Sequence, residues 1–500
     1  MALEDELLRQ RHERIEQIRN LGFDPYGQAF EYTQTIPQVL AEYSSKTAEE
    51  LAGHINVRIA GRILTIRRMG KAGFLHLLQE GEKLQIYVKK DAVNEISYKL
   101  YELLDIGDII GVSGYLFRTK TGELTVHVEE LVFLSKIMFA LPEKWHGLED
   151  IETRYRQRYL DLIANSEIRK IFITRSKIIQ SLRHQLDERG FLEVETPMMQ
   201  PLYGGAVARP FVTHHNTLDI NLYLRIAPEL YLKRLVVGGM ERVYEINRNF
   251  RNEGISTHHN PEFTMLEFYQ AYTDYLGMMQ LSTDLLRQVA IDATGSALVT
   301  FEGRVLDFGA FRKFSMREAV MEFWPQPEKP SLDNVKDPQW LLRHSKESTP
   351  GMALVDLFEH HVEKQLFEPS IIYDFPVEVS PLSKNKLSEP EFVERFEIYA
   401  GRMEIANAFT ELNDPQEQRR RFELQLARKA GGDQEAHVMD EDYIRALSYG
   451  MPPAGGEGIG IDRLTKVLTG SKSIRDVILF PLLRPEGDIG LVDRLRELAP

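Results

Sequence analysis

Hydrophobic side chains recur at helical spacing through residues 1–20, and charged residues fill the other positions. The pattern predicts an amphipathic helix whose apolar stripe is formed by Leu3, Leu7, Leu8, Ile15 and Ile18. A glycine and a proline follow within residues 21–25, and both residue types interrupt helices. We therefore expect residues 1–55 to form a helical N-terminal segment.

The hydrophobic period changes from about residue 56, where short strands are separated by turn residues. Five strands are predicted, at residues 57–63, 73–78, 84–88, 109–117 and 124–134. A longer connection near residues 91–104 suits a helix. This arrangement predicts an OB-fold, which is a small β-barrel, at residues 56–140. The alternative is some other β-sandwich.

Beyond residue 140 the pattern mixes helices and strands. A linker at residues 141–172 precedes a larger α/β portion at residues 173–500. This portion opens with a helix near residues 175–189, which Gly190 ends, and a strand then runs into Pro197. Residues 300–370 are interpreted as a mostly helical insertion. The predicted fold class is therefore α+β, with a barrel followed by a larger mixed domain.

The composition limits the chemistry. The 500 residues include 61 Lys and Arg against 75 Asp and Glu, and the net charge of −14 disfavours attraction of the whole molecule to nucleic acid. Because there are no cysteines, disulfides, thiolate nucleophiles and Cys-ligated metal sites are excluded. No secretory signal and no membrane-spanning run is visible. We expect a cytoplasmic protein with no membrane partner.

One stretch of the predicted barrel is positively charged, although the chain as a whole is negative. No acidic residue lies between Glu50 and Glu80, and this stretch carries five basic residues: Arg58, Arg62, Arg67, Arg68 and Lys71. Phe74 is a candidate exposed ring beside them. Basic residues interleaved with a stacking ring on a small barrel are typical of single-stranded nucleic-acid binding. The alternative is a solvated hairpin face.

Residues 243–269 are interpreted as a strand, a polar loop and a second strand. Because side chains alternate along a strand, Arg251 and Glu253 are predicted to share one face. The second strand should present four residues on one face: Phe263, Met265, Glu267 and Tyr269. A guanidinium grips phosphate through its rigid fork, and an aromatic ring stacks on a base. The alternative is a salt-bridged surface hairpin.

A second hairpin is predicted at residues 397–404. A two-residue turn at Ala400 and Gly401 would place Glu397 directly opposite Glu404, where the two carboxylates repel. Mg²⁺ on a nucleotide would offset that repulsion, because it is a hard cation that prefers oxygen ligands. Three residues further along alternate onto one face: Asn407, Phe409 and Glu411. Glu404 has the wrong parity for that face, so we expect a bulge before Asn407.

A glycine-rich run at residues 455–460 precedes a helical pattern that begins near Arg463. The run lacks the glycine order of a dinucleotide fold and the Lys-Ser/Thr of a P-loop, so it is a weak signal alone. Glycines allow a ligand to approach the backbone closely. Arg463 could meet a phosphate there.

Taken together, these residues resemble the three motifs of class II aminoacyl-tRNA synthetases. The motifs are Pro197 after its strand, residues 250–253, and the glycine run that ends in Arg463. The specific resemblance is to the lysyl-tRNA synthetase family, and it covers essentially the whole chain. It is carried by residues 203–206, 208–211, 225–230, 250–269 and 407–414, and in the barrel by 70–74 with Gln85.

The resemblance implies a seven-stranded antiparallel catalytic sheet flanked by helices, an OB-fold that binds the anticodon, and a homodimer. It implies that ATP and L-lysine form lysyl-adenylate, and that lysine is then transferred to the 3′ end of tRNA(Lys). For ATP it implies that Arg251 contacts the α-phosphate and the substrate carboxylate, while His259 contacts the far phosphates and Arg463 closes the other side of the nucleotide. Glu253 would contact the adenine amino group, and Phe263 would stack on adenine. Glu397 and Glu404 would hold Mg²⁺.

For lysine the resemblance implies a second set of contacts. Gly205 and Glu229 would meet the α-amino group and Asn407 the carboxylate, with Glu267, Tyr269, Phe409 and Glu411 around the side chain. Phe74 and Gln85 would read the central anticodon uridine. Two positions depart from the expected pattern: Glu457 lies in the glycine run where an apolar residue is expected, and Ala400 replaces a common glycine.

Three other functions remain open at this point. A relative that lysylates a translation factor would share the catalytic residues but lack the barrel. An aspartyl- or asparaginyl-tRNA synthetase would share the architecture, but its substrate has no distal cation to match Glu267 and Glu411. A non-catalytic RNA-binding descendant would have lost Arg251, Arg463 or the paired glutamates, and all of them are present.

Overall fold

The computed structural model describes residues 2–142, 148, 150–430 and 438–485. The chain divides into two compact units, one running to Arg169 and the other from Lys170 to Leu483. Parts of the predicted linker (143–147 and 149) and of the predicted larger domain (431–437 and 486–500) lie outside the described residues. Within the described residues, no helix is both long enough and apolar enough to cross a membrane.

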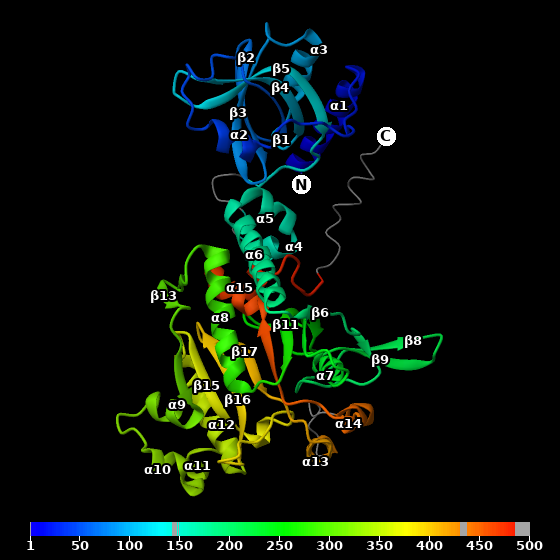
Figure 1. The fold of residues 1–500 in the computed structure, drawn as a ribbon. Helices are drawn as coiled ribbons and strands as arrows, with labels where there is room; N and C mark the ends of the chain where they lie inside the picture. The colour runs from blue at the N-terminus through cyan, green and yellow to red at the C-terminus, as the bar shows by residue number, and fades with distance from the viewer. Residues whose placement is uncertain (1, 143–147, 149, 431–437, 486–500) are drawn as a thin grey trace. The chain divides into compact units, whose positions relative to one another are not determined.

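The first unit is built around a closed five-stranded barrel with the strand order β1-β2-β3-β5-β4 (Figure 1). This topology confirms the predicted OB-fold, including the helix between the third and fourth strands. The elements are α1 (Ala2–Asn20), α2 (Ile36–Tyr43), β1 (Asn56–Met69), β2 (Ala72–Gln79), β3 (Glu82–Lys89), α3 (Glu95–Leu103), β4 (Ile109–Arg118), β5 (Leu124–Ser135), α4 (Ile151–Arg156) and α5 (Arg158–Ala164).

Helix α1 forms where the hydrophobic periodicity placed it. Leu8, Ile15 and Ile18 are buried, so its apolar stripe packs against the unit as the pattern predicted. The predicted linker at residues 141–172 is largely helical. It contains α4 and α5, and α6 (Ser166–Glu188) begins before its end.

The second unit is built on an eight-stranded sheet with the order β14-β15-β16-β17-β18-β11-β10-β6. The strands are β6 (Leu192–Glu193), β10 (Arg242–Phe250), β11 (Glu262–Ala271), β14 (Arg312–Ser315), β15 (Ser370–Pro376), β16 (Phe392–Ala400), β17 (Met403–Thr410) and β18 (Ala454–Gly460). Six central strands are antiparallel, but the edge strands β14 and β6 pair in parallel with β15 and β10. The seven-stranded antiparallel sheet was therefore wrong in strand number and at both edges, where long connections return the chain in the parallel sense.

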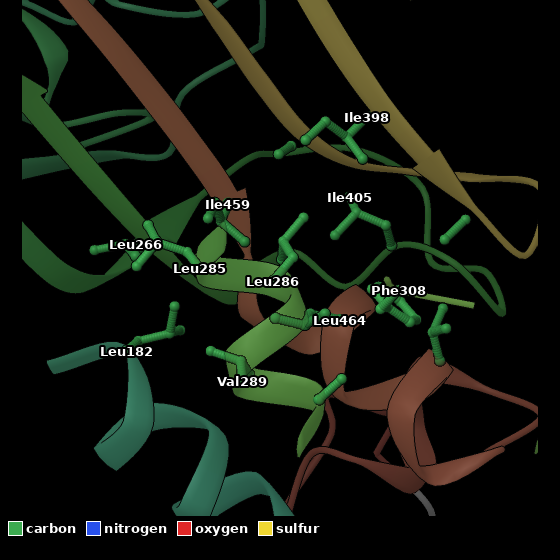
Figure 2. Packing of buried hydrophobic residues seen from close by; sticks show 14 of the residues in the cluster. Leu182, Leu266, Leu285, Leu286, Val289, Phe308, Ile398, Ile405, Ile459 and Leu464 are labelled. Carbon is green, nitrogen blue, oxygen red and sulfur yellow. The ribbon is translucent and has the colours of Figure 1, made fainter. Parts of the chain in front are cut away.

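Helices α8 (Tyr275–Thr294) and α15 (Ile461–Thr469) cover one face of this sheet. Figure 2 shows Leu285, Leu286 and Val289 of α8 packed near Leu266 of β11 and Ile459 of β18. These side chains belong to one buried cluster that also includes Leu464 of α15. The rigid packing fixes the strands whose other face carries the predicted site residues.

The remaining elements flank the sheet. Between residues 298 and 315 the chain forms strands, so only the later part of the predicted 300–370 insertion is helical. The flanking elements are β7 (Met199–Gln200), β8 (Val212–His215), β9 (Ile220–Leu224), α7 (Glu229–Val237), β12 (Leu298–Phe301), β13 (Arg304–Asp307), α9 (Met316–Glu322), α10 (Leu332–Lys336), α11 (Pro338–His344), α12 (Pro350–His361), α13 (Pro415–Ala430) and α14 (Glu441–Ser448).

The hairpin of β16 and β17 differs from its predicted register. Gly401 and Arg402 form the turn, both with positive φ (60° and 63°), so Ala400 pairs with Met403 and Glu404 pairs with Tyr399. Two left-handed residues make the turn type that suits a tight hairpin. The register then shifts between Ile398 and Tyr399, which confirms the bulge expected before Asn407. The predicted pairing of Glu397 with Glu404 was wrong, because Glu397 lies opposite Asn407.

Candidate active site

A cavity of 590 Å³ lies in the second unit. Its wall is formed by β11, β17, β18, the loop between β10 and β11, and the start of α15. Twelve of the predicted site residues line it: Gly205, Glu229, Arg251, Glu253, His259, Phe263, Glu267, Tyr269, Glu404, Asn407, Phe409 and Arg463. Glu397 and Glu411 are absent from the wall, but each contacts a residue that belongs to it.

Arg251 and Glu253 lie in a loop, because β10 ends at Phe250. Both residues line the same cavity, as the predicted shared face requires, but they do so from a loop and not through strand alternation. The Arg251 N–H still donates to the Pro261 carbonyl at 2.9 Å, which continues the hairpin by one step and directs the residue to the cavity. Burial lowers the pKa of Arg251, but an arginine remains charged at neutral pH.

Strand β11 presents Phe263, Met265, Glu267 and Tyr269 to the cavity, as strand alternation predicted. The Arg251 guanidinium carbon lies 5.1 Å from the centroid of the Phe263 ring. Nε of Arg251 has no hydrogen-bond partner among the described residues. This end of the cavity therefore offers a stacking ring beside a cation with unused donor capacity.

Arg463 contacts two other predicted residues. Its Nη1 donates to the backbone oxygen of Glu404 at 2.9 Å and to Oε2 of Glu404 at 3.1 Å, and its Nη2 donates to Nε2 of His259 at 3.2 Å. Burial, reinforced by the charge of Arg463, lowers the pKa of His259, so the ring is neutral at pH 7. Its Nδ1 lies 3.1 Å from Oγ of Ser256, to which it donates in the tautomer that Arg463 selects.

Asp462 fixes the start of α15 next to this group. Its carboxylate accepts from the Thr264 N–H at 2.7 Å and pairs with Arg175 at 2.6 Å. Neither this clamp nor the position of Lys466 was predicted from the sequence. Nζ of Lys466 is 3.1 Å from Nδ1 of His258, another residue on the cavity wall.

Arg395 connects the predicted metal ligand Glu397 to Asn407. It donates to Oε1 of Glu397 at 2.5 Å and to Oδ1 of Asn407 at 3.0 Å, while the Tyr399 hydroxyl donates to Oε2 of Glu397 at 2.5 Å. Because its oxygen is occupied, Asn407 is left with amide N–H donors for an anion in the cavity. Arg395 was not among the predicted site residues, although its parity on β16 matches that of Glu397.

Glu397 and Glu404 fit the hard oxygen chemistry of Mg²⁺. Burial raises the pKa of Glu397 to about 7, Arg395 opposes this shift, and the charge of Glu404 adds to it. A divalent cation would relieve that repulsion. No cluster of three or more metal-ligating side chains is found in the described part of the chain. Two carboxylates suit Mg²⁺, which keeps water and phosphate oxygens as its other ligands.

The other end of the cavity is acidic. Tyr269 donates its hydroxyl to Oε1 of Glu267 at 2.6 Å, and both side chains are buried. Glu229 and Glu411 are buried near them. Burial raises the pKa of Glu267 to about 8, and the charge of Glu229 adds to the shift.

Lys233 on α7 lies between Glu229 and Glu411. Its Nζ is 2.6 Å from Oε1 of Glu229 and forms an ion pair with Oε2 of Glu411. The lysine side chain is fully buried. Lys233 was not predicted as a site residue, because a glutamate and a lysine four residues apart usually form a surface pair on a helix.

The glycine-rich run forms strand β18, which leads directly into α15. Gly456 and Gly458 line the cavity beside β11 and β17. A Cβ on Gly456 would lie 2.2 Å from Oε1 of Glu411 and 2.4 Å from Cε1 of Tyr269. A side chain at this position would therefore fill the acidic end. Gly205, with φ +87°, similarly leaves no room for a Cβ beside Glu229.

Glu457 is hydrogen-bonded to Oγ of Ser282 on α8, within the core that covers the back of the sheet. It is 2% exposed, and burial raises its pKa to about 8. The residue that departed from the expected pattern is therefore a buried, protonated acid behind the site at neutral pH.

The barrel carries the other predicted residues. Phe74 on β2 is partly exposed and its ring centroid lies 4.8 Å from that of Tyr87. Gln85 is held by two contacts, donating to Oε2 of Glu123 at 2.7 Å and accepting from Oγ1 of Thr125 at 2.9 Å. Arg67 lies opposite Phe74 in the register and is exposed.

The basic stretch is not one exposed patch. Arg62 donates to the Gly107 carbonyl and Arg68 to carbonyls at the end of α3, which is a favourable place for a cation. The guanidinium of Arg58 lies over the Phe30 ring. Arg67, Arg68 and Lys71 are exposed, and Arg67 lies opposite Phe74 in the strand register.

Comparison with known proteins agrees with this architecture. The family described as tRNA synthetases class II (D, K and N) matches residues 150–484, and the family of OB-fold nucleic acid binding domains matches residues 57–134. The fold and the site thus define a class II tRNA synthetase.

Individual relatives show which family within this class the chain resembles. The chain is 53% identical over 488 residues to the lysine–tRNA ligase of Syntrophomonas wolfei, covering 96% of this chain and 97% of that protein. It is 51% identical to the lysine–tRNA ligase of Moorella thermoacetica, covering 97% and 99%, and 49% identical to that of Bacillus subtilis, covering 95% and 97%. The chain belongs to the lysine–tRNA ligase family.

Proposed function

We propose that the chain activates L-lysine with ATP and transfers it to the 3′ end of tRNA(Lys). The observation that carries this proposal is a single cavity with arginines at one end and buried carboxylates at the other. The arginine end suits the phosphates of ATP and the acidic end suits an ammonium group.

In the first step, the lysine carboxylate attacks the α-phosphorus of ATP. A carbon-bound oxygen forms the new bond to phosphorus, and the bond to pyrophosphate breaks. No general base is needed, because the carboxylate is already ionised at pH 7. In the second step, a hydroxyl at the 3′ end of the tRNA attacks the lysyl carbonyl, and AMP leaves.

The arginines are assigned to stabilise the negative charge that develops on the phosphates in the first step. Arg251 is assigned to the α-phosphate and the substrate carboxylate, and Arg463 with His259 to the far phosphates. Glu253 is assigned to the adenine amino group and Phe263 to the face of the base. Positioning and electrostatic stabilisation account for most of the catalysis of such transfers.

Glu397 and Glu404 would hold Mg²⁺, which supplies positive charge against the phosphates when it is bound. Arg395 and Tyr399 fix the carboxylate of Glu397 for that role. In the resting site Arg463 offsets the charge of Glu404.

The acidic end is assigned to the lysine side chain. Glu267, Tyr269, Phe409 and Glu411 would surround the ε-ammonium, with Glu229 and Gly205 at the α-ammonium and Asn407 at the carboxylate. A neutral amino acid would leave buried carboxylates without a partner, which is a strong basis for rejection. Aspartate or asparagine would meet repulsion or no partner there.

The barrel supports a tRNA acceptor over a protein acceptor. Phe74 offers a ring for stacking and Gln85 an oriented amide, and both are assigned to the central anticodon uridine. Base stacking on such a ring contributes about 1–3 kcal/mol. The cytoplasmic location expected from the sequence remains part of this proposal.

A homodimer is also proposed. Exposed apolar side chains gather on the segment from β6 to β9, and large exposed apolar patches mark interaction surfaces. The residues, each at least 40% exposed, are Leu192, Met198, Met199, Val212, Leu218 and Ile220. Sedimentation of the full chain would test this, and a monomer at micromolar concentration would contradict it.

Amino-acid-dependent exchange of pyrophosphate into ATP tests the function directly. We expect lysine alone among the common amino acids to drive the exchange, and total tRNA to accept lysine. The variant Glu411→Gln should raise the KM for lysine far more than the KM for ATP, whereas Glu394→Gln on β16 should not. Exchange driven by aspartate, or equal loss of affinity for both substrates, would overturn the assignment.

A further inference from the structure

Three buried carboxylates meet one resident ammonium at the acidic end of the cavity. Glu229, Glu267 and Glu411 are 6%, 4% and 1% exposed, and Lys233 is fully buried. Nζ of Lys233 contacts Glu229 and Glu411, and it lies 5.2 Å from the centroid of the Phe409 ring. The ammonium is therefore fixed from three sides and cannot leave to solvent without opening the packing.

This arrangement leaves one oxygen of Glu411 unpartnered next to residues that line the cavity. Oε2 pairs with Lys233, whereas Oε1 lies beside Gly456 and the Tyr269 ring and has no hydrogen-bond partner among the described residues. Gly456 and Tyr269 both line the cavity. Lys233 thus orients Glu411 without occupying its free oxygen.

The net charge of this cluster depends on whether lysine is bound. Three ionised carboxylates with one ammonium would carry two uncompensated negative charges in a site that excludes water, which is highly unfavourable. A lysine substrate brings two ammonium groups, one at each end, while its carboxylate faces the arginine end. Three carboxylates and three ammonium groups then balance in the complex.

We propose that the acidic end binds lysine in exchange for protons, with Lys233 as the positioning residue and resident counter-ion that leaves two carboxylate charges for the two ammonium groups of the substrate. The inference rests on the proposed function and deepens it. In the empty site two of the three carboxylates hold protons, and the incoming ammonium groups displace them.

The surrounding groups favour this storage of protons. Burial raises the pKa of Glu411 and of Glu229, and Lys233 opposes both shifts. Burial disfavours the charge of Lys233, but the two carboxylates reverse this and raise its pKa. The charged and titratable groups that face this cluster are Glu229 and Lys233 on α7, Glu267 and Tyr269 on β11, Glu411 after β17, Arg395 on β16, Glu245 on β10, and Tyr443 on α14.

Calorimetric titration of the full-length protein with lysine tests the proposal. Titrations at pH 7 in buffers of different ionisation enthalpy count the protons released, and we expect about two per lysine, falling above pH 8 as Glu267 ionises in the empty site. Lysine affinity should rise with pH up to this point. No dependence of the heat on buffer would overturn the proposal, although the ligase activity could stand.

The variant Lys233→Met tests whether Lys233 acts as the resident counter-ion. With only two ammonium groups for three carboxylates, one carboxylate must stay protonated in the complex, so the Kd for lysine at pH 7 should rise at least tenfold. ATP affinity should stay within twofold of the wild type, which also reports that the variant folds. Lys233→Arg should restore part of the lysine affinity.

A matched control is available on the same helix. Arg234 pairs with Asp440 and Asp442, away from the three carboxylates, so Arg234→Met should leave the Kd for lysine within twofold of the wild type. An unchanged lysine Kd in Lys233→Met would overturn the role of Lys233. If Lys233→Met fails to fold, the proton count of the wild type still decides the exchange.

Discussion

Arg463 and Glu404 are bonded to each other in the site: Nη1 of the arginine donates to the glutamate backbone oxygen at 2.9 Å and to its carboxylate at 3.1 Å. One residue is assigned to a phosphate and the other to Mg²⁺. Each therefore satisfies the other until the nucleotide arrives. In the proposed mechanism, binding of ATP with Mg²⁺ would replace this internal pair with two opposite-charge contacts.

Replacement of Glu404 should change the metal requirement most. In Glu404→Gln we expect the Mg²⁺ concentration for half-maximal exchange to rise about tenfold, since one anionic oxygen ligand is lost. The measurement is pyrophosphate exchange across a magnesium series at saturating ATP. Glu394→Gln on β16 is the control, and an unchanged magnesium curve in Glu404→Gln would remove the residue from the metal site.

Arg251 should not be replaceable by lysine. Arg251→Lys keeps the charge but loses the planar fork, so we expect kcat/KM for exchange to fall about 100-fold or more, as for loss of one preorganised donor. The matched control is Arg248→Lys, since the Arg248 side chain is 43% exposed and its Nη1 lies 3.4 Å from Oε1 of Glu262. Equal activity of the two variants would show that the fork is not used.

The glycines of β18 should differ in their tolerance of a methyl group. In Gly456→Ala the Cβ would overlap the carboxylate of Glu411 and the ring of Tyr269, so the KM for lysine should rise at least tenfold. In Gly458→Ala the Cβ meets only the mobile end of Met265 at 2.8 Å, so the effect should be several times smaller. Steady-state exchange kinetics for lysine would distinguish them, and the reverse order would contradict this packing.

Glu457 should make stability depend on pH. Its pKa is about 8 in the folded chain because of burial, against about 4.3 when unfolded, so the folded state binds more protons between these values. Stability should therefore fall as pH rises through this window, by about 1.4 kcal/mol per pH unit, and level off above pH 8.

The variant Glu457→Gln keeps a hydrogen-bonding group near Ser282 and has no charge to lose. The difference in Tm between the variant and the wild type should therefore grow from pH 5 to pH 8 in favour of the variant. Thermal unfolding followed by circular dichroism measures this. Parallel Tm curves for the two proteins would show that Glu457 does not titrate in the folded chain.

A substitution in the barrel should weaken tRNA binding without changing the activation of lysine by ATP. Phe74→Ala should raise the KM for tRNA in aminoacylation about 5- to 100-fold, the loss of one stacked base, while pyrophosphate exchange without tRNA stays the same. Tyr32→Ala removes a ring that is 53% exposed elsewhere in this unit and serves as the control. Similar effects of both variants would argue against a specific role for Phe74.

Strand alternation and motif spacing predicted much of this molecule. The barrel strands were predictable because each buries one face, and the cavity face of β11 followed from the same rule. The bulge before Asn407 followed from parity alone. These features depend on local pattern, which a sequence carries directly.

Other features depend on contacts that the local pattern does not encode. The turn at Gly401 and Arg402 needs a non-glycine residue in a left-handed conformation, so its register was misjudged by one residue. Arg251 reaches the cavity from a loop. The burial of Lys233 depends on Glu411, which is distant in the chain and lies beside it only in the fold.

The bulge in β17 also constrains how this chain can change in length. Because the extra residue brings Glu404 onto the side that Asn407 occupies, deletion of one residue there would turn the proposed metal ligand into the core. Insertion of one residue would do the same, whereas a two-residue change would preserve the facing. Homologues that vary here should therefore differ by even numbers of residues, or they should lose nucleotide activation.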